Sequence, residues 1–131
     1  MELLYLLCNP KEQEDATLAL ERETARRLAE IRRYMEEHLD EPLTIPFLSR
    51  RACLSTTTFK EGFRRLYGLP VHTWLRQRRM ERAAELLRDS SLSVLGVAQS
   101  VGYGSASQFS AAFHRQYGMT PAIYRKMSGP A

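Results

Sequence analysis

The sequence predicts an all-α fold built from two copies of one helical unit. The copies are 50 residues apart, because five residues recur at that offset: Ser55, Phe59, Phe63, Tyr67 and Gly68 return as Ser105, Phe109, Phe113, Tyr117 and Gly118. The aromatic residues of each copy follow at steps of four, which keeps them on one face of an α-helix. No stretch alternates apolar and polar residues as a strand would. Taken together, these observations predict about seven helices and no sheet.

Each copy carries the capping residues of a short helix. Ser55 and Ser105 are good N-caps, because a serine oxygen accepts a hydrogen bond from the first helical turn. A glycine ends each copy, where only a residue without a Cβ adopts the left-handed conformation cheaply. Leu54 and Phe59 occupy the two positions of a hydrophobic staple, which fixes the angle at which the chain enters the helix. The pattern therefore predicts a helix-turn-helix in each copy.

The rest of the chain predicts further helices in order. An amphipathic helix begins at Arg26, and Thr44 caps a short helix that leads to the turn at residues 52–55. A long helix over 71–89 has an apolar face that reaches both copies. Its residues Trp74 and Leu75 are expected on the first copy and Leu86 and Leu87 on the second. We predict the first helix-turn-helix over 44–68, the linker helix over 71–89 and the second helix-turn-helix over 93–118.

Residues 1–25 differ from the rest of the chain. The apolar segment Leu3–Leu7 is followed by a charged run, Asn9–Asp15, that contains Pro10 and predicts a linker or a bend. We interpret residues 1–25 as the end of a preceding sensor or dimerisation domain plus a linker; the alternative is that they fold back onto the helical domain, residues 26–126. Residues 127–131 are predicted to be a disordered tail.

Charge is unevenly distributed along the 131 residues. Residues 1–40 carry six basic and ten acidic side chains, whereas residues 41–131 carry thirteen and five, a net charge of +8. A basic domain beside an acidic leader suits a polyanionic partner. The alternative is a basic surface that serves only solubility.

Several classes of function find no support in the sequence. Cys8 and Cys53 form no CxxC pair and are expected to be reduced thiols in a cytoplasmic protein. No stretch of 18 apolar residues predicts a membrane span. The three histidines lie in separate elements, and there is no glycine-rich phosphate loop or metal-ligand spacing. We therefore expect no enzyme activity, no cofactor and no metal.

The polar faces of the two repeated helices are the candidate functional surface. The first carries Thr57, Lys60, Glu61 and Arg64 opposite Phe59, Phe63 and Leu66; the second carries Ser107, Gln108, Ala111, His114 and Arg115. One such stripe is ordinarily the solvated face of a surface helix. Two stripes on duplicated helices, each preceded by a short helix and a tight turn, favour readout of DNA.

Residues spread over 26–126 resemble the DNA-binding domain of AraC/XylS-type bacterial transcription regulators. The resemblance rests on Ala52-Cys53-Leu54-Ser55, Arg79-Met80, Leu86-Leu87, Val101-Gly102-Tyr103, Tyr117-Gly118 and Pro121, in that order and spacing. It implies two homeodomain-like helix-turn-helix subdomains joined by a linker helix, with both recognition helices in successive major grooves of double-stranded promoter DNA. The run Phe59–Arg64 and the leucine-rich leader look most like the subgroup that controls ferric-siderophore uptake.

The resemblance also implies roles for individual residues. Base readout falls on Thr57, Lys60, Glu61, Ser107 and Gln108, and phosphate contact on Thr56, Arg64, Arg65, Ser110, His114 and Arg115. Lys60 suits guanine, Glu61 suits cytosine and the Thr57 methyl group suits thymine. The alternative for Glu61 is a surface pair with Arg64 or Arg65. Because Ala106 and Ala111 stand where relatives often place long polar side chains, we expect the second half-site to be read less strictly.

The expected partners follow from the same resemblance. They are promoter DNA, RNA polymerase and a missing N-terminal effector-binding domain, in a regulator that activates rather than represses. A homodimer through the N-terminal segment is a further alternative. The main competing hypothesis is a helical protein-protein interaction module, because helix-turn-helix folds do not fix function.

Overall fold

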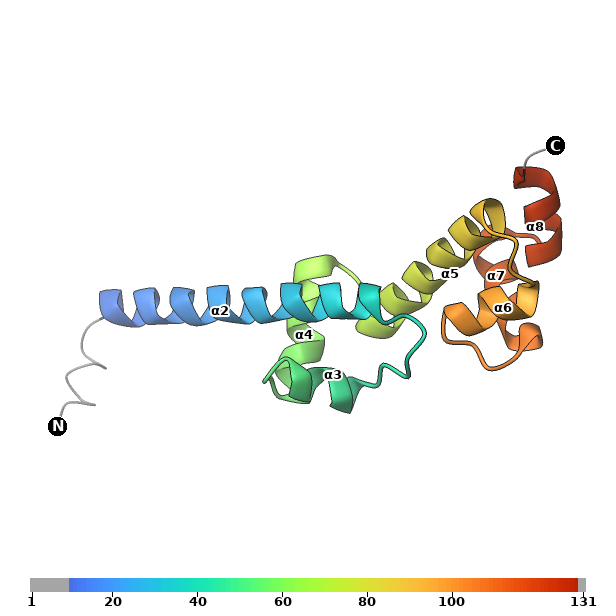
Figure 1. Cartoon of the computed structure of the whole chain (residues 1–131). Helices are drawn as coiled ribbons and strands as arrows, with labels where there is room; N and C mark the ends of the chain where they lie inside the picture. The colour runs from blue at the N-terminus through green and yellow to red at the C-terminus, as the bar shows by residue number, and fades with distance from the viewer. Residues whose placement is uncertain (1–9, 130–131) are drawn as a thin grey trace.

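The computed structural model describes residues 10–129, and every regular element in that range is a helix. Seven helices follow in order: α2 Pro10–Glu37, α3 Ile45–Arg51, α4 Thr56–Tyr67, α5 Val71–Asp89, α6 Val94–Ser100, α7 Ala106–Tyr117 and α8 Pro121–Ser128. Figure 1 shows two groups of helices joined by α5. The predicted all-α fold with two helix-turn-helix subdomains and a long linker helix is confirmed.

Unit 1 consists of the C-terminal half of α2, helices α3 and α4, and the start of α5. Its core is one cluster of buried apolar side chains that runs from Leu28 on α2 to Leu75 on α5. Phe59 and Phe63 of α4 lie at its centre with 0% exposure. The apolar face that the four-residue spacing predicted for α4 is therefore the face that closes this core.

Unit 2 consists of the C-terminal half of α5 with helices α6, α7 and α8. A second cluster runs from Met80 on α5 to Phe113 on α7. Trp74 and Leu75 pack in the first cluster and Leu86 and Leu87 in the second, as predicted. Helix α5 is thus the last helix of unit 1 and the first helix of unit 2.

The repeat extends further than the sequence comparison indicated. The ring of Trp74 meets Phe63 edge-on at 5.7 Å between centroids, and the ring of Tyr124 meets Phe113 in the same way at 5.3 Å. Trp74 and Tyr124 are also 50 residues apart. Helix α8 therefore closes unit 2 as the start of α5 closes unit 1, because each supplies one aromatic ring that packs edge-on with a buried phenylalanine of α7 or α4.

Side-chain caps fix where the short helices begin. Ser55 accepts a hydrogen bond from the Thr58 backbone N–H at 3.1 Å, and Ser105 accepts one from Gln108 at 3.2 Å. Threonine or serine caps α3, α6 and α8 in the same way. At the other end, Gly68 and Gly118 are left-handed, with φ of 80° and 74°. The predicted caps of both recognition helices are confirmed.

The predicted start of the N-terminal helix is wrong. Helix α2 begins at Pro10 rather than at Arg26, and residues 10–37 form one continuous helix instead of a linker followed by a helix. Proline is tolerated in a first turn, where its missing N–H would have no helical partner. The side chains of residues 10–22 are exposed, and this half of α2 extends beyond unit 1 (Figure 1). The apolar segment Leu3–Leu7 lies outside the described residues.

Three further expectations are wrong in detail. Leu66 and Leu95, which helical periodicity predicts on the buried faces of their helices, are 47% and 45% exposed. Leu66 is turned toward a groove beside α2, and Leu95 lies in the first turn of α6, before its buried residues Val97 and Ala98. Helix α8 continues to Ser128, so Met127 and Ser128 are helical rather than part of a tail. Within residues 10–129, no helix is long and apolar enough to cross a membrane.

Candidate nucleic-acid interface

The turn between α3 and α4 is held by backbone and side-chain hydrogen bonds. The Leu54 N–H donates to the Ser49 carbonyl at 2.9 Å, and Cys53 takes the left-handed conformation with φ of 56°. Arg27 of α2 donates from Nη1 to the Cys53 carbonyl at 2.9 Å. Helix α2 therefore fixes the turn from which the recognition helix α4 starts.

The second turn repeats the first with one additional residue. The Tyr103 N–H donates to the Ala98 carbonyl at 2.9 Å, and Gly102 is left-handed with φ of 86°. Gly102 follows Cys53 by 49 residues, whereas the caps of the two recognition helices are 50 apart, because Gly104 is inserted before Ser105. Each recognition helix thus follows a tight turn that contains one left-handed residue, and each helix begins at a serine cap.

The predicted stripe on α4 exists as a surface. Thr57, Lys60, Glu61 and Arg64 are all exposed on the side of the helix that faces away from the buried rings. Among the described residues, Glu61 forms no ion pair with Arg64 or Arg65. The four side chains together present donors, a carboxylate acceptor and a methyl group, which are the groups that distinguish base edges in a major groove.

Two predicted phosphate contacts of α4 lie beside this stripe. Thr56 is exposed at the first position of the helix. Arg65 lines a groove between α4 and α2, together with Glu21 and Thr24. Arg65 therefore lies at the edge of the stripe that borders α2, rather than at its centre.

The stripe on α7 is smaller and less polar. Ser107, Gln108, His114 and Arg115 are exposed, and Ser110 is half-buried. Arg115 donates from Nε to the Ala111 carbonyl of its own helix at 3.4 Å. Because Ala111 occupies the middle of the stripe with a methyl group, the long polar side chains stand only at its ends.

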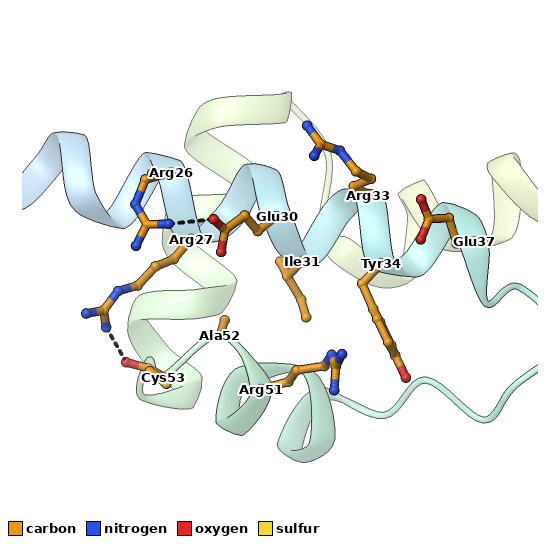
Figure 2. A pocket seen from close by; sticks show the side chains of 10 residues that line it. All are labelled: Arg26, Arg27, Glu30, Ile31, Arg33, Tyr34, Glu37, Arg51, Ala52 and Cys53. Atoms are coloured by element: carbon orange, nitrogen blue, oxygen red, sulfur yellow. Dashed lines mark hydrogen bonds and ion pairs between the residues drawn. The ribbon is translucent and has the colours of Figure 1, made fainter.

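Two arginines of α2 have partners within the protein. Arg26 and Arg27 donate to the Glu23 carboxylate, and these hydrogen bonds lower the pKa of Glu23 to about 2. Figure 2 shows the groove between α2 and α3, with Arg26 reaching Glu30 and Arg27 reaching the carbonyl of Cys53. The guanidinium of Arg51 lies 3.9 Å from the centre of the Tyr34 ring. In this groove Arg26, Arg27 and Arg51 therefore each have an internal partner, whereas the described residues form no ion pair with Lys60 or Arg64 of the stripe on α4.

Sequence reasoning missed Arg27 as the support of the first turn. No spacing rule finds this contact, since its partner is a backbone carbonyl 26 residues away. Within residues 10–129, no group of three or more His, Cys, Asp or Glu side chains is placed to hold a metal ion.

Comparison with known proteins assigns this arrangement to a family. A family model described as a helix-turn-helix domain matches residues 48–127. The chain is 32% identical over 101 residues to the HTH-type transcriptional regulator ExsA of Pseudomonas aeruginosa, covering 77% of this chain and 36% of that protein. It is 30% identical over 95 residues to the virulence regulon transcriptional activator VirF of Yersinia enterocolitica, covering 72% and 35%. The chain thus spans about a third of the length of these curated relatives.

A solved structure supports the same assignment. The DNA-binding domain of the global transcriptional factor AdpA, in complex with a target DNA, superimposes with a TM-score of 0.74 at 38% identity, covering 76% of this chain and 90% of that one. The duplicated turns, the capped recognition helices and the similarity to these relatives all support one assignment. The chain belongs to the AraC-type helix-turn-helix family and is a DNA-binding domain of a transcription regulator.

Proposed function

We propose that the domain binds promoter DNA with α4 and α7 in successive major grooves on one face of the duplex. The observation that carries the proposal is that turn, cap and exposed stripe occur twice, once in each of the two units that α5 joins. Helix α5 has 19 residues, so it spans ~28 Å at ~1.5 Å of rise per residue. That length is comparable to the ~34–36 Å that separate successive major grooves on one face.

Unit 1 supplies most of the direct base readout in this proposal. Lys60 donates to guanine O6 and N7, Glu61 accepts from cytosine N4, and the Thr57 methyl group contacts a thymine methyl. Arg64, Arg65 and Thr56 neutralise or bind phosphates on either side of the groove. Contacts of this second kind hold the helix in register but carry little sequence information.

Unit 2 reads its half-site through fewer bases. Ser107 and Gln108 make the base contacts, while Ser110, His114 and Arg115 contact the backbone. The alanine in the middle of the stripe supports this division, because a methyl group offers a base edge no hydrogen bond. Shape and deformability of the DNA then contribute the remaining preference at this half-site.

The domain acts within a longer regulator that activates transcription. Two facts support this part of the proposal: one relative is described as a transcriptional activator, and the chain spans about a third of its relatives' length. Contact with RNA polymerase, an N-terminal effector-binding domain and a homodimer through the N-terminal segment belong to the same proposal. The ferric-siderophore-uptake subgroup remains a prediction supported only by the run Phe59–Arg64 and the leucine-rich leader.

The experiment that tests DNA binding is fluorescence anisotropy over a salt series, followed by selection from a random duplex pool of ~20 base pairs, about two helical turns. We expect the affinity to fall steeply with salt, with a log–log slope of about −0.9 for each phosphate contacted. The selected motif should have two parts one turn apart. Binding that is weak and insensitive to salt would instead favour the protein-protein interaction module.

A further inference from the structure

Arg79 of α5 is tied to the loop that connects α2 to α3. Its guanidinium donates from Nε to the Leu39 carbonyl at 3.0 Å and from Nη2 to the Glu41 carbonyl at 2.8 Å. Leu39 and Glu41 belong to unit 1, whereas the residue after Arg79, Met80, opens the core of unit 2. Arg79 therefore stands at the boundary between the two cores.

The α6–α7 turn of unit 2 also lies against the loop that connects α2 to α3. A Cβ atom on Gly102 would lie 2.7 Å from the Leu39 carbonyl oxygen and 3.1 Å from Cζ and Nη2 of Arg79. These distances leave no room for any side chain, so the backbone of the α6–α7 turn lies directly against the loop of unit 1. Since this turn leads through Ser105 into α7, its contact with unit 1 bears on the direction of the second recognition helix.

Arginine suits this place better than any other residue. Its planar fork offers parallel N–H donors, which meet two carbonyls of one loop at once; lysine presents a single point of charge. Burial lowers the pKa of Arg79, and the nearby Tyr103 and Asp40 partly oppose that shift. Among the described residues Arg79 forms no ion pair, so backbone carbonyls are its principal partners.

We propose that Arg79 and Gly102 form a rigid contact between the two units, here called the joint. The joint fixes the angle and separation of α4 and α7, and hence the spacing of the two half-sites that the domain accepts. In this role Arg79 is a positioning residue that need not touch DNA. The consequence for DNA rests on the two-groove binding proposed above; the rigidity of the joint itself does not.

The first test needs no DNA. Residual dipolar couplings of backbone amides report whether the two units tumble as one body. We expect one alignment tensor to fit both units of the native protein and of Arg82→Lys, the matched control, because Arg82 is exposed and its one ion pair among residues 10–129 is with Glu85 of its own helix. Arg79→Lys should require two tensors. A single tensor for Arg79→Lys would overturn the joint, since α5 alone would then hold the units.

Gly102 offers an independent pair of variants. Gly102→Asn and Gly118→Asn both place asparagine at a left-handed position, and asparagine tolerates that conformation better than most residues. Of these two positions, residue 102 is the one where the new Cβ would meet unit 1, because no described atom beyond the chain neighbours lies within 4 Å of a Cβ at residue 118. We expect Gly102→Asn to require a separate alignment tensor for each unit, and Gly118→Asn to be fitted by one tensor like the native protein. Equal behaviour of the two variants in folded samples would contradict the role of Gly102.

The second test varies the DNA. Half-sites selected for the native domain are moved apart in single base-pair steps, each of which rotates one site by about 34–36°. We expect a single preferred spacing for the native protein. Arg79→Lys should lose about 10-fold in affinity there but less than about 3-fold at the neighbouring spacings, because a loose connection lowers the effective concentration of the second unit.

The two tests separate the proposals. If Arg79→Lys requires two alignment tensors but the native protein shows no preferred half-site spacing on DNA, the joint is supported and two-groove binding is wrong. If native binding has a sharp spacing and Arg79→Lys keeps both that spacing and one tensor, two-groove binding stands and the joint is wrong.

Discussion

Cys53 and Gly102 occupy equivalent positions in the two turns but meet different demands. Both are left-handed, with φ of 56° and 86°. At Gly102 a side chain is excluded by the carbonyl of Leu39, whereas the Cys53 side chain is exposed. A Cβ in the left-handed region costs roughly 1–2 kcal/mol. Cys53 therefore carries conformational strain that the bond from Arg27 to its carbonyl helps to hold.

Replacing Cys53 with glycine should stabilise the domain. Glycine relieves the left-handed strain but loses more conformational entropy on folding, so we expect a net gain of roughly 0.5–1 kcal/mol in the free energy of unfolding. Urea denaturation followed by circular dichroism measures it. Cys53→Ala, which keeps the Cβ, is the control and should change little. A glycine variant less stable than the alanine variant would show that no strain is relieved.

Two exposed side chains should affect DNA binding differently. Lys60→Ala should change the preferred sequence and cost about 1–3 kcal/mol on the native site, because it removes a contact to a base edge. Arg115→Ala should weaken binding to all sequences alike and reduce the salt slope by about one. Affinity measured on native and substituted duplexes separates these effects. Uniform losses from both variants would contradict the assigned division of labour.

At the scale of elements, α2 behaves as two segments of one helix. Leu28, Ile31 and Met35 are buried against unit 1, whereas the side chains of residues 10–22 are exposed. Between them, Glu23 pairs with Arg26 and Arg27 on the helix surface. The packed segment supports the first turn, and the exposed segment contributes little burial to the core.

Truncation should distinguish the two segments. Deleting residues 1–22 should leave the free energy of unfolding within ~0.5 kcal/mol of the native value, because the side chains of residues 10–22 are exposed and exposed positions contribute little to stability. Met35→Ala, at a site with 0% exposure, should cost about 2–5 kcal/mol. Thermal and urea denaturation of both proteins provide the comparison. A large loss on truncation would mean that the exposed half of α2 supports unit 1.

At the scale of the whole molecule, the duplicated architecture carries unequal surfaces. The cores match closely, ring by ring, from Phe59 and Phe63 to Phe109 and Phe113. The exposed stripes do not match, since unit 1 presents Lys60, Glu61 and Arg64, whereas the stripe of unit 2 has Ala111 at its centre. Packing therefore keeps the two units alike in geometry, while their exposed positions differ in chemistry.

Unequal surfaces predict unequal half-sites. Single base-pair substitutions in the half-site bound by unit 1 should cost about 1–3 kcal/mol each, the usual range for a directly read base pair. Substitutions in the half-site bound by unit 2 should cost less, with the largest effects where they alter DNA shape. A complete substitution scan of the selected duplex measures both. Equal losses in the two half-sites would contradict the weaker readout assigned to α7.

Much of the site was predictable because its signals are local. The stripe on α4 follows from helical periodicity and the buried spacing of Phe59 and Phe63, and all four of its residues are exposed as expected. The start of α2 was not predictable in this way, because Pro10 is compatible with both a bend and a first helical turn. Leu66 was misplaced because periodicity gives the face of a helix but not how far the neighbouring helix covers it.

The helices, their caps and the two polar stripes follow from the sequence alone, since each depends on residues within a few positions of one another. The duplication follows from it as well, because the same residues recur at a constant offset of 50. The contacts between distant segments become visible only in the folded structure. Arg27 binds the carbonyl of a turn 26 residues away, and Arg79 binds a loop 38 to 40 residues away that Gly102 also touches. These partners are backbone carbonyls, which every residue possesses and which therefore leave no mark in the sequence.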